Sequence, residues 1–161
     1  MEIFKPRDAI KNFSNRDAIE LEFINPGSGA IFLAEGTGGN GTIDNNFVSG
    51  NFERCSGFMF KSKLADRYAF FHALPGTPLW ERDFEKLAAL AGGEVVLIES
   101  PASTKKPWIT GNLSRKLSIE QVGLISVGSY PFDVLFKPKE NLVYVHRGDN
   151  RYNDVLAYSV F

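Results

Sequence analysis

The sequence is poor in cysteine and histidine. Cys55 is its only cysteine, and His72 and His146 are its only histidines among 161 residues. A single cysteine cannot form an internal disulfide, and so few thiol and imidazole ligands do not favour a zinc site. We therefore expect a protein without a disulfide framework, without a bound metal and without a cofactor.

The sequence also lacks a strong charge of one sign and a long apolar run. Its net charge is −1 and its isoelectric point is about 6.1, so the dense basic surface of a nucleic-acid binder is missing. No run approaches the roughly 20 apolar residues of a membrane span, and the charged N-terminal residues do not resemble a signal peptide. We expect neither nucleic acid nor membrane as a partner. The expected location is the cytoplasm, either of the protein's own cell or of a host cell that receives it as a secreted effector.

The length of the chain favours one domain. A chain of 161 residues can bury about 70% of its unfolded surface around a single core. The sequence contains no internal repeat, no heptad run and no low-complexity linker. We therefore predict a single domain over residues 1–161.

Short apolar runs separated by turn residues predict many strands. The continuous run Val95-Val96-Leu97-Ile98 predicts a strand covered on both faces. Residues 36–41 are rich in glycine but lack the lysine and the strand-to-helix context of a phosphate-binding loop, so they are predicted to form a mobile or tightly turning loop. Besides the runs around Cys55 and His72, strands are predicted at residues 21–24, 30–34, 123–127, 133–136 and 142–146, with a hairpin turn at 137–141.

Residues 77–91 have the period of a helix. Thr77 is a suitable N-cap, Pro78 suits the first helical position, and Gly92 and Gly93 suit the end. A shorter helix is predicted near residues 119–121. Together with the strands, these elements predict an α+β fold in which layered, β-sandwich-like sheets carry one main helix packed on a sheet. The apolar stripe of the predicted main helix comprises Trp80, Phe84, Leu87 and Ala91.

The two runs around Cys55 and His72 are predicted to form an antiparallel hairpin. A turn centred between Lys63 and Leu64 places Cys55 opposite His72, which follows it by 17 residues. Directly opposed side chains have Cβ atoms about 4.5–5.5 Å apart, close enough for a thiol to meet an imidazole. An adjacent imidazole is the usual means of making a cysteine nucleophilic, so the pair is a candidate catalytic dyad. The same register places Gly57 opposite Phe70 and Met59 opposite Tyr68.

Each residue of this pair also has a structural interpretation. A lone cysteine in a phenylalanine-rich strand is often only a small buried apolar side chain. A histidine at the end of a strand often serves only to satisfy local hydrogen bonds. His146 is expected to have such a structural role in the last predicted hairpin.

The order of these elements resembles the CheD family of chemoreceptor glutamine deamidases and, through it, the cysteine deamidase fold shared with bacterial deamidating toxins. The matching features are a cysteine at the start of a strand, a histidine 17 residues later at the head of His72-Ala73-Leu74-Pro75-Gly76, and a helix predicted directly afterwards. A strand and a closing hairpin, residues 133–147, then follow in the same order. The resemblance covers about residues 47–147.

The resemblance implies roles for three residues. Cys55 corresponds to the nucleophile and His72 to the base, and Ser49, six residues before the cysteine, stands where the family has a threonine that orients the histidine. The Gly-Ser pair that precedes the family's cysteine is here Glu53-Arg54. The implied reaction is hydrolysis of a glutamine side chain of a protein substrate to glutamate, with release of ammonia and without a cofactor.

Two other functions remain open from the sequence. The same scaffold could serve as a binding module or inhibitor without turnover. A reactive thiolate would also suit a cysteine protease or a transglutaminase-like acyl transferase. Cys55→Ala would leave the effect of a binding module intact, and only deamidation converts glutamine to glutamate without cleavage or cross-linking.

Overall fold

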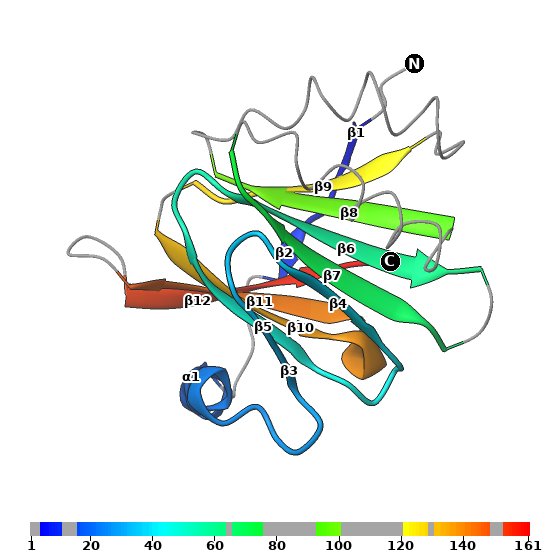
Figure 1. Cartoon of the computed structure of the whole chain (residues 1–161). Helices are drawn as coiled ribbons and strands as arrows, with labels where there is room; N and C mark the ends of the chain where they lie inside the picture. Colours follow the sequence, from blue (N-terminus) through cyan, green and yellow to red (C-terminus); the bar gives the residue numbers. More distant parts are fainter. Residues whose placement is uncertain are drawn as a thin grey trace.

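The computed structural model describes residues 4–10, 16–63, 66–75, 93–100, 121–128, 131–148 and 153–161. These residues form two β-sheets of six strands each that face one another (Figure 1). Sheet A has the strand order β1-β9-β8-β6-β7-β4, and sheet B has the order β2-β12-β11-β10-β5-β3. The strands are β1 (Phe4–Pro6), β2 (Ala9–Ile10), β3 (Ile31–Leu33), β4 (Gly38–Gly41), β5 (Phe47–Phe52), β6 (Ser56–Ser62), β7 (Tyr68–Ala73), β8 (Gly93–Glu99), β9 (Val122–Ser126), β10 (Phe132–Lys137), β11 (Leu142–Gly148) and β12 (Asn153–Ser159).

Both sheets are mixed, with parallel and antiparallel neighbours. The described residues also include one α-helix, α1 (Arg16–Ile24), and a short 3₁₀ turn, η2 (Pro138–Glu140), in the hairpin between β10 and β11. The prediction of a strand-rich, layered fold is therefore confirmed. The helices predicted at 77–91 and near 119–121 fall outside the described residues, except for Gln121, which is not helical.

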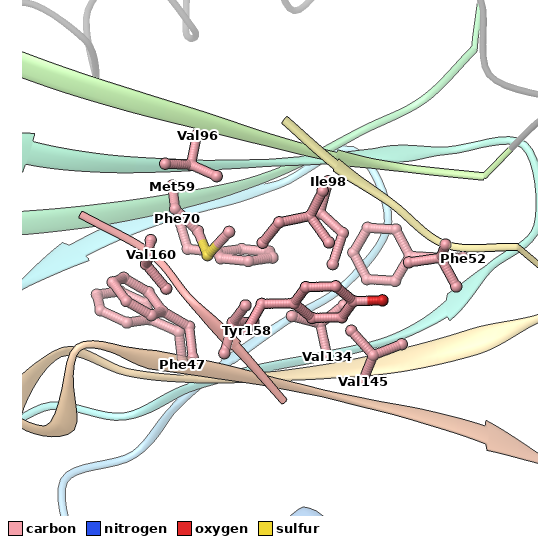
Figure 2. Close-up of a cluster of buried hydrophobic side chains, with 14 of the residues drawn as sticks. Phe47, Phe52, Met59, Phe70, Val96, Ile98, Val134, Val145, Tyr158 and Val160 are labelled. Atoms are coloured by element: carbon pink, nitrogen blue, oxygen red, sulfur yellow. The ribbon is translucent and has the colours of Figure 1, made fainter. Parts of the chain in front are cut away.

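The main core lies between the two sheets. Figure 2 shows Met59, Phe70 and Ile98 of sheet A directed toward side chains of sheet B such as Phe47 and Val134. These side chains are almost completely buried, so the two inner faces form a continuous apolar layer. Along a regular strand, successive side chains alternate between this layer and the opposite face of the sheet.

The central strand of sheet A agrees with its sequence pattern. β8 lies between β6 and β9, and its residues Val95 to Ile98 are each at most 2% exposed. A strand that is buried on both faces has no polar alternation, because neither side meets water. The predicted strands at 123–127, 133–136 and 142–146 and the turn at 137–141 are also confirmed.

The strand predicted at residues 21–24 is wrong, because these residues end helix α1. Ile19 and Phe23, four residues apart, both pack on the outer face of sheet B with Val48 and Leu135. The apolar pattern of this segment therefore begins before residue 21. Its spacing of four residues is that of a helix. Lys137 of β10 holds the helix by an ion pair of 2.9 Å with Glu22.

The glycine-rich loop predicted at residues 36–41 is only partly correct. Residues 38–41 form strand β4, which pairs with β7 from Gly38 opposite Phe71 to Gly41 opposite Tyr68. Glycine disfavours strands by propensity, but here the hydrogen bonds to the edge of β7 outweigh that preference. The remaining residues of the segment turn the chain from sheet B to sheet A.

Candidate active site

The cysteine and the histidine lie on the hairpin of β6 and β7, but they are not directly opposite. His72 pairs with Gly57 and Ala73 pairs with Ser56, while Cys55 directly precedes β6. The predicted register is therefore wrong by two residues. The other predicted pairs are wrong in the same way, because Met59 lies opposite Phe70 and Lys61 opposite Tyr68.

The position of the turn explains this error. The Ser62 amide donates to the Arg67 carbonyl at 2.9 Å, so the hairpin is centred one residue later than predicted. Moving the centre of a hairpin by one residue changes each pairing by two. An even shift leaves every side chain on its predicted face of the sheet, since faces alternate with a period of two.

Cys55 and His72 consequently remain at the same end of the hairpin and face the same core. Cys55 belongs to the buried cluster between the sheets and is 6% exposed. His72 is completely buried and stacks on Phe52, which belongs to the same cluster. Diagonal neighbours of this kind are typically about 7–8 Å apart, farther than directly opposed residues. In the described part of the chain, His72 Nε2 has no hydrogen-bond partner, so the thiol is not hydrogen-bonded to it.

Ser49 of β5 contacts the other nitrogen of the imidazole. Its Oγ lies 2.6 Å from His72 Nδ1, in a buried contact that joins the two sheets, and 2.7 Å from the carbonyl oxygen of Leu33. A carbonyl can only accept, and a hydroxyl has one proton, so Ser49 donates to Leu33 and accepts from His72. His72 Nδ1 therefore carries the proton, and Nε2 presents a lone pair.

Burial keeps this imidazole neutral. His72 has no exposed surface, and desolvation lowers its pKa from 6.5 to about 4. A neutral imidazole with a lone pair on Nε2 can accept a proton from a neighbouring acid. The site therefore offers a base at neutral pH, and Nε2 is the atom that would act.

The main chain of His72 is fixed by the segment between β3 and β4. The His72 amide donates to the Thr37 carbonyl at 2.9 Å, and the Gly36 amide donates to the His72 carbonyl at 2.8 Å. The glycine-rich segment thus contributes to the site through its backbone. Its composition did not indicate this role, because these hydrogen bonds use main-chain atoms that every non-proline residue has.

The segment before Cys55 crosses from sheet B to sheet A. Glu53 and Arg54 are exposed, and the Ser100 hydroxyl donates to the Glu53 carbonyl at 2.8 Å. The chain therefore carries two charged side chains at the surface beside Cys55.

Sequence reasoning missed Phe52 and the carbonyl of Leu33. The Phe52 ring stacks on His72 with centroids 3.8 Å apart and planes inclined by 11°. From Ser49, simple alternation along a strand places Phe52 on the opposite face, so no pattern in the sequence indicates this contact.

The second histidine lies elsewhere. His146 of β11 packs its ring against Phe23 of α1, with centroids 5.6 Å apart, on the outer side of sheet B. Among the described residues no three histidine, cysteine or carboxylate side chains form a group that could hold a metal ion. None of the helices in that part of the chain is long and apolar enough to cross a membrane.

Neither the models of known protein families nor the curated proteins contain a match to this sequence. The site combines a buried neutral imidazole, a serine that holds its tautomer, and a cysteine at the adjacent end of the neighbouring strand.

Proposed function

We propose that this protein is a cysteine-dependent protein-glutamine deamidase, with Cys55 as nucleophile, His72 as general base and Ser49 as the residue that orients the base. The observation that carries the proposal is the buried contact of 2.6 Å between Ser49 Oγ and His72 Nδ1. It joins two residues that are 23 positions apart and gives His72 the tautomer that a base acting through Nε2 needs. The order of elements that resembles the CheD family supports the choice of reaction.

In the proposed mechanism, His72 Nε2 takes the thiol proton as Cys55 Sγ attacks the carbon of a glutamine side-chain amide. The imidazolium then gives this proton to the amide nitrogen, the carbon–nitrogen bond breaks, and ammonia leaves. A water molecule attacks the resulting thioester while His72 takes one of its protons, and that proton returns to sulfur as glutamate is released. In the formation of the thioester and again in its hydrolysis, His72 thus accepts one proton and gives it up.

The low pKa of His72 favours a particular timing of proton transfer. A base with a pKa of about 4 does not take a proton from a resting thiol at neutral pH, so the proton moves as the sulfur attacks. The imidazolium formed in this way is a strong acid, which helps it to protonate the departing nitrogen. The step requires Sγ to come within about 3–3.5 Å of the substrate carbon and Nε2 to lie within hydrogen-bond reach of the thiol.

One observation favours a second candidate, a binding module that uses the scaffold without turnover. His72 Nε2 has no hydrogen-bond partner among the described residues, so the direct contact of a formed dyad is not made in this structure. For such a module, Cys55→Ala would leave binding to a partner and the biological effect unchanged.

Alkylation of the thiol tests the proposed pair. Iodoacetamide, a small carboxamide, is expected to label Cys55 of the wild-type protein at pH 7 much faster than Cys55 of the His72→Ala variant. His146→Ala is the matched control, because it removes a histidine that contacts Phe23 far from the pair. Mass spectrometry measures the labelled fraction with time. Equally slow labelling of all three proteins would contradict the proposal.

Product analysis then separates the possible reactions. A protein extract is incubated with wild-type protein or with Cys55→Ala, and mass spectrometry compares the peptides. A deamidase is expected to convert particular glutamines to glutamate and to release an equal amount of ammonia. Cleaved or cross-linked peptides would instead indicate a protease or an acyl transferase.

A further inference from the structure

The ladder between β5 and β10 contains an irregularity beside the candidate site. Ser49 pairs with Val134, and Phe52 pairs with Phe132. Two residues of β5, Gly50 and Asn51, therefore stand opposite the single residue Asp133. Asn51 has a φ of 65°, in the left-handed region. An extra residue on one strand of an antiparallel pair is a β-bulge.

The bulge changes the direction in which Phe52 points. Before it, Phe47 and Ser49 face the space between the sheets, and Val48 faces the outer side with helix α1. Without an extra residue, Phe52 would follow Val48 to the outer side. It instead lies completely buried between the sheets (Figure 2).

As a result, one strand holds the imidazole at two different surfaces. Ser49 binds the Nδ1 edge of His72 at 2.6 Å, and Phe52 covers a face of the ring at a centroid distance of 3.8 Å. The Phe52 ring also stacks on Phe132 of β10, with centroids 5.0 Å apart and an interplanar angle of 9°. An edge contact and a face contact together restrict both the displacement and the rotation of the ring, and so the direction of the Nε2 lone pair.

Asp133 stabilises the bulge from the neighbouring strand. Its Oδ1 accepts a hydrogen bond of 3.0 Å from the Asn51 amide. A Cβ atom at Gly50 would lie 2.8 Å from the same oxygen, so a side chain at position 50 would displace the carboxylate. Asn51 tolerates the left-handed conformation better than most residues, and its side chain donates to Glu35 Oε1 at 2.5 Å.

We propose that this bulge is a positioning device for His72, in which Phe52 sets the plane of the imidazole and Asp133 holds the bulge that directs Phe52 inward. The catalytic meaning of this inference rests on the proposed function. Phe52 and Asp133 are positioning residues, because they act through the orientation of His72 and neither reacts with substrate.

The orientation of His72 is measurable without a substrate. With only two histidines in the chain, ¹⁵N-labelled histidine gives few NMR signals, and the His146→Gln variant assigns those of His72. The wild-type protein is expected to show one tautomer, with the proton on Nδ1, as its contact with Ser49 requires. In Phe52→Leu and Asp133→Ala the imidazole is expected to turn away from Ser49, so these variants should show a mixture of tautomers. Their His72 pKa is expected to rise toward 6.5.

Two further variants control for general loss of stability. Phe47→Leu removes another completely buried phenylalanine of the same strand, one that stacks on Phe70 and Phe136. It is expected to keep the single tautomer. Asp133→Asn retains an oxygen acceptor for the Asn51 amide and is expected to restore the wild-type spectrum that Asp133→Ala loses.

A single Nδ1–H tautomer in both Phe52→Leu and Asp133→Ala would overturn the inference, as would the same mixture in Phe47→Leu. Should Phe52→Leu not fold, the comparison of Asp133→Ala with Asp133→Asn decides the question, since Asp133 is only partly buried. With an active protein, both positioning variants are expected to lower kcat about 10- to 100-fold with little change in KM.

The outcomes separate this inference from the proposed function. Mixed tautomers in the two variants of a protein that converts no glutamine would support the positioning role and contradict the deamidase. Glutamine conversion by a protein in which these variants keep a single tautomer would support the deamidase and contradict the positioning role.

Discussion

Cys55→Ala is expected to abolish conversion of glutamine to glutamate, with a loss of about 10⁴-fold or more, because the thioester cannot form without the thiol. His72→Gln is expected to lose nearly as much. Residues that act as a unit are strongly non-additive, so the double variant should be no slower than Cys55→Ala alone. Ammonia release and peptide mass spectrometry measure each rate.

Two substitutions of Ser49 test whether its hydroxyl orients His72. Ser49→Ala removes the acceptor of the buried Nδ1 proton, so the favoured tautomer is lost and the rate is expected to fall by about 10²- to 10⁴-fold. Ser49→Thr keeps the hydroxyl and is expected to retain most of the activity. Ser126→Ala, a change at an exposed position of β9, is the matched control. Full activity of Ser49→Ala would show that the contact is only structural.

The wild-type protein is expected to lose stability between pH 7 and pH 5 because of His72. Its pKa is about 4 in the folded protein and 6.5 in an unfolded chain, so the unfolded state binds more protons in this window. The free energy of unfolding therefore falls as the pH falls, by about 2 kcal/mol at pH 5 and by about 3 kcal/mol in total once the pH is below 4. Above pH 7 both states are neutral at this residue and the effect is absent.

Urea denaturation at pH 7 and pH 5 measures this effect. The carboxylates that titrate at lower pH are common to all variants, so the wild-type protein is compared with His72→Gln. In this variant the difference in the free energy of unfolding between pH 7 and pH 5 is expected to be smaller by about 2 kcal/mol. His146→Gln controls for the loss of a histidine as such. An unchanged pH dependence in His72→Gln would contradict the burial of a neutral imidazole at this position.

A substitution at Gly57 tests how tightly the core packs against the hairpin of β6 and β7. A Cβ atom at this position would lie 2.5 Å from Ile98 Cγ2 and 3.1 Å from Phe70 Cζ. Gly57→Ala is therefore expected to lower the free energy of unfolding by about 1–3 kcal/mol through overpacking. Gly128→Ala, where no atom lies within 4 Å of the added carbon, is the matched control. Equal stability of the two variants in urea would show that sheet A can repack around residue 57.

Much of the fold was predictable because strands leave strong local patterns. The run Val95 to Ile98 indicated a doubly covered strand, and the last hairpin was evident from its apolar segments and its turn residues. Residues 21–24 by themselves fit a strand, and the helical period of α1 shows only when Ile19 is included. The sequence of β4 does not indicate a strand, because glycine carries no strand preference. In each case the deciding contacts were with residues distant in the sequence.

For the candidate site, the sequence by itself determined which chemical groups are present and their order: a single cysteine, a histidine 17 residues later, and a serine six residues before the cysteine. The predicted register also placed Cys55 and His72 on the same face, and this part of the prediction holds because the register error is an even number of residues. Only the tertiary structure decided the rest. The position of a turn sets the register, a bulge held by Asp133 turns Phe52 inward, and burial between two sheets keeps His72 neutral, because each of these depends on neighbours that pattern and spacing do not reveal.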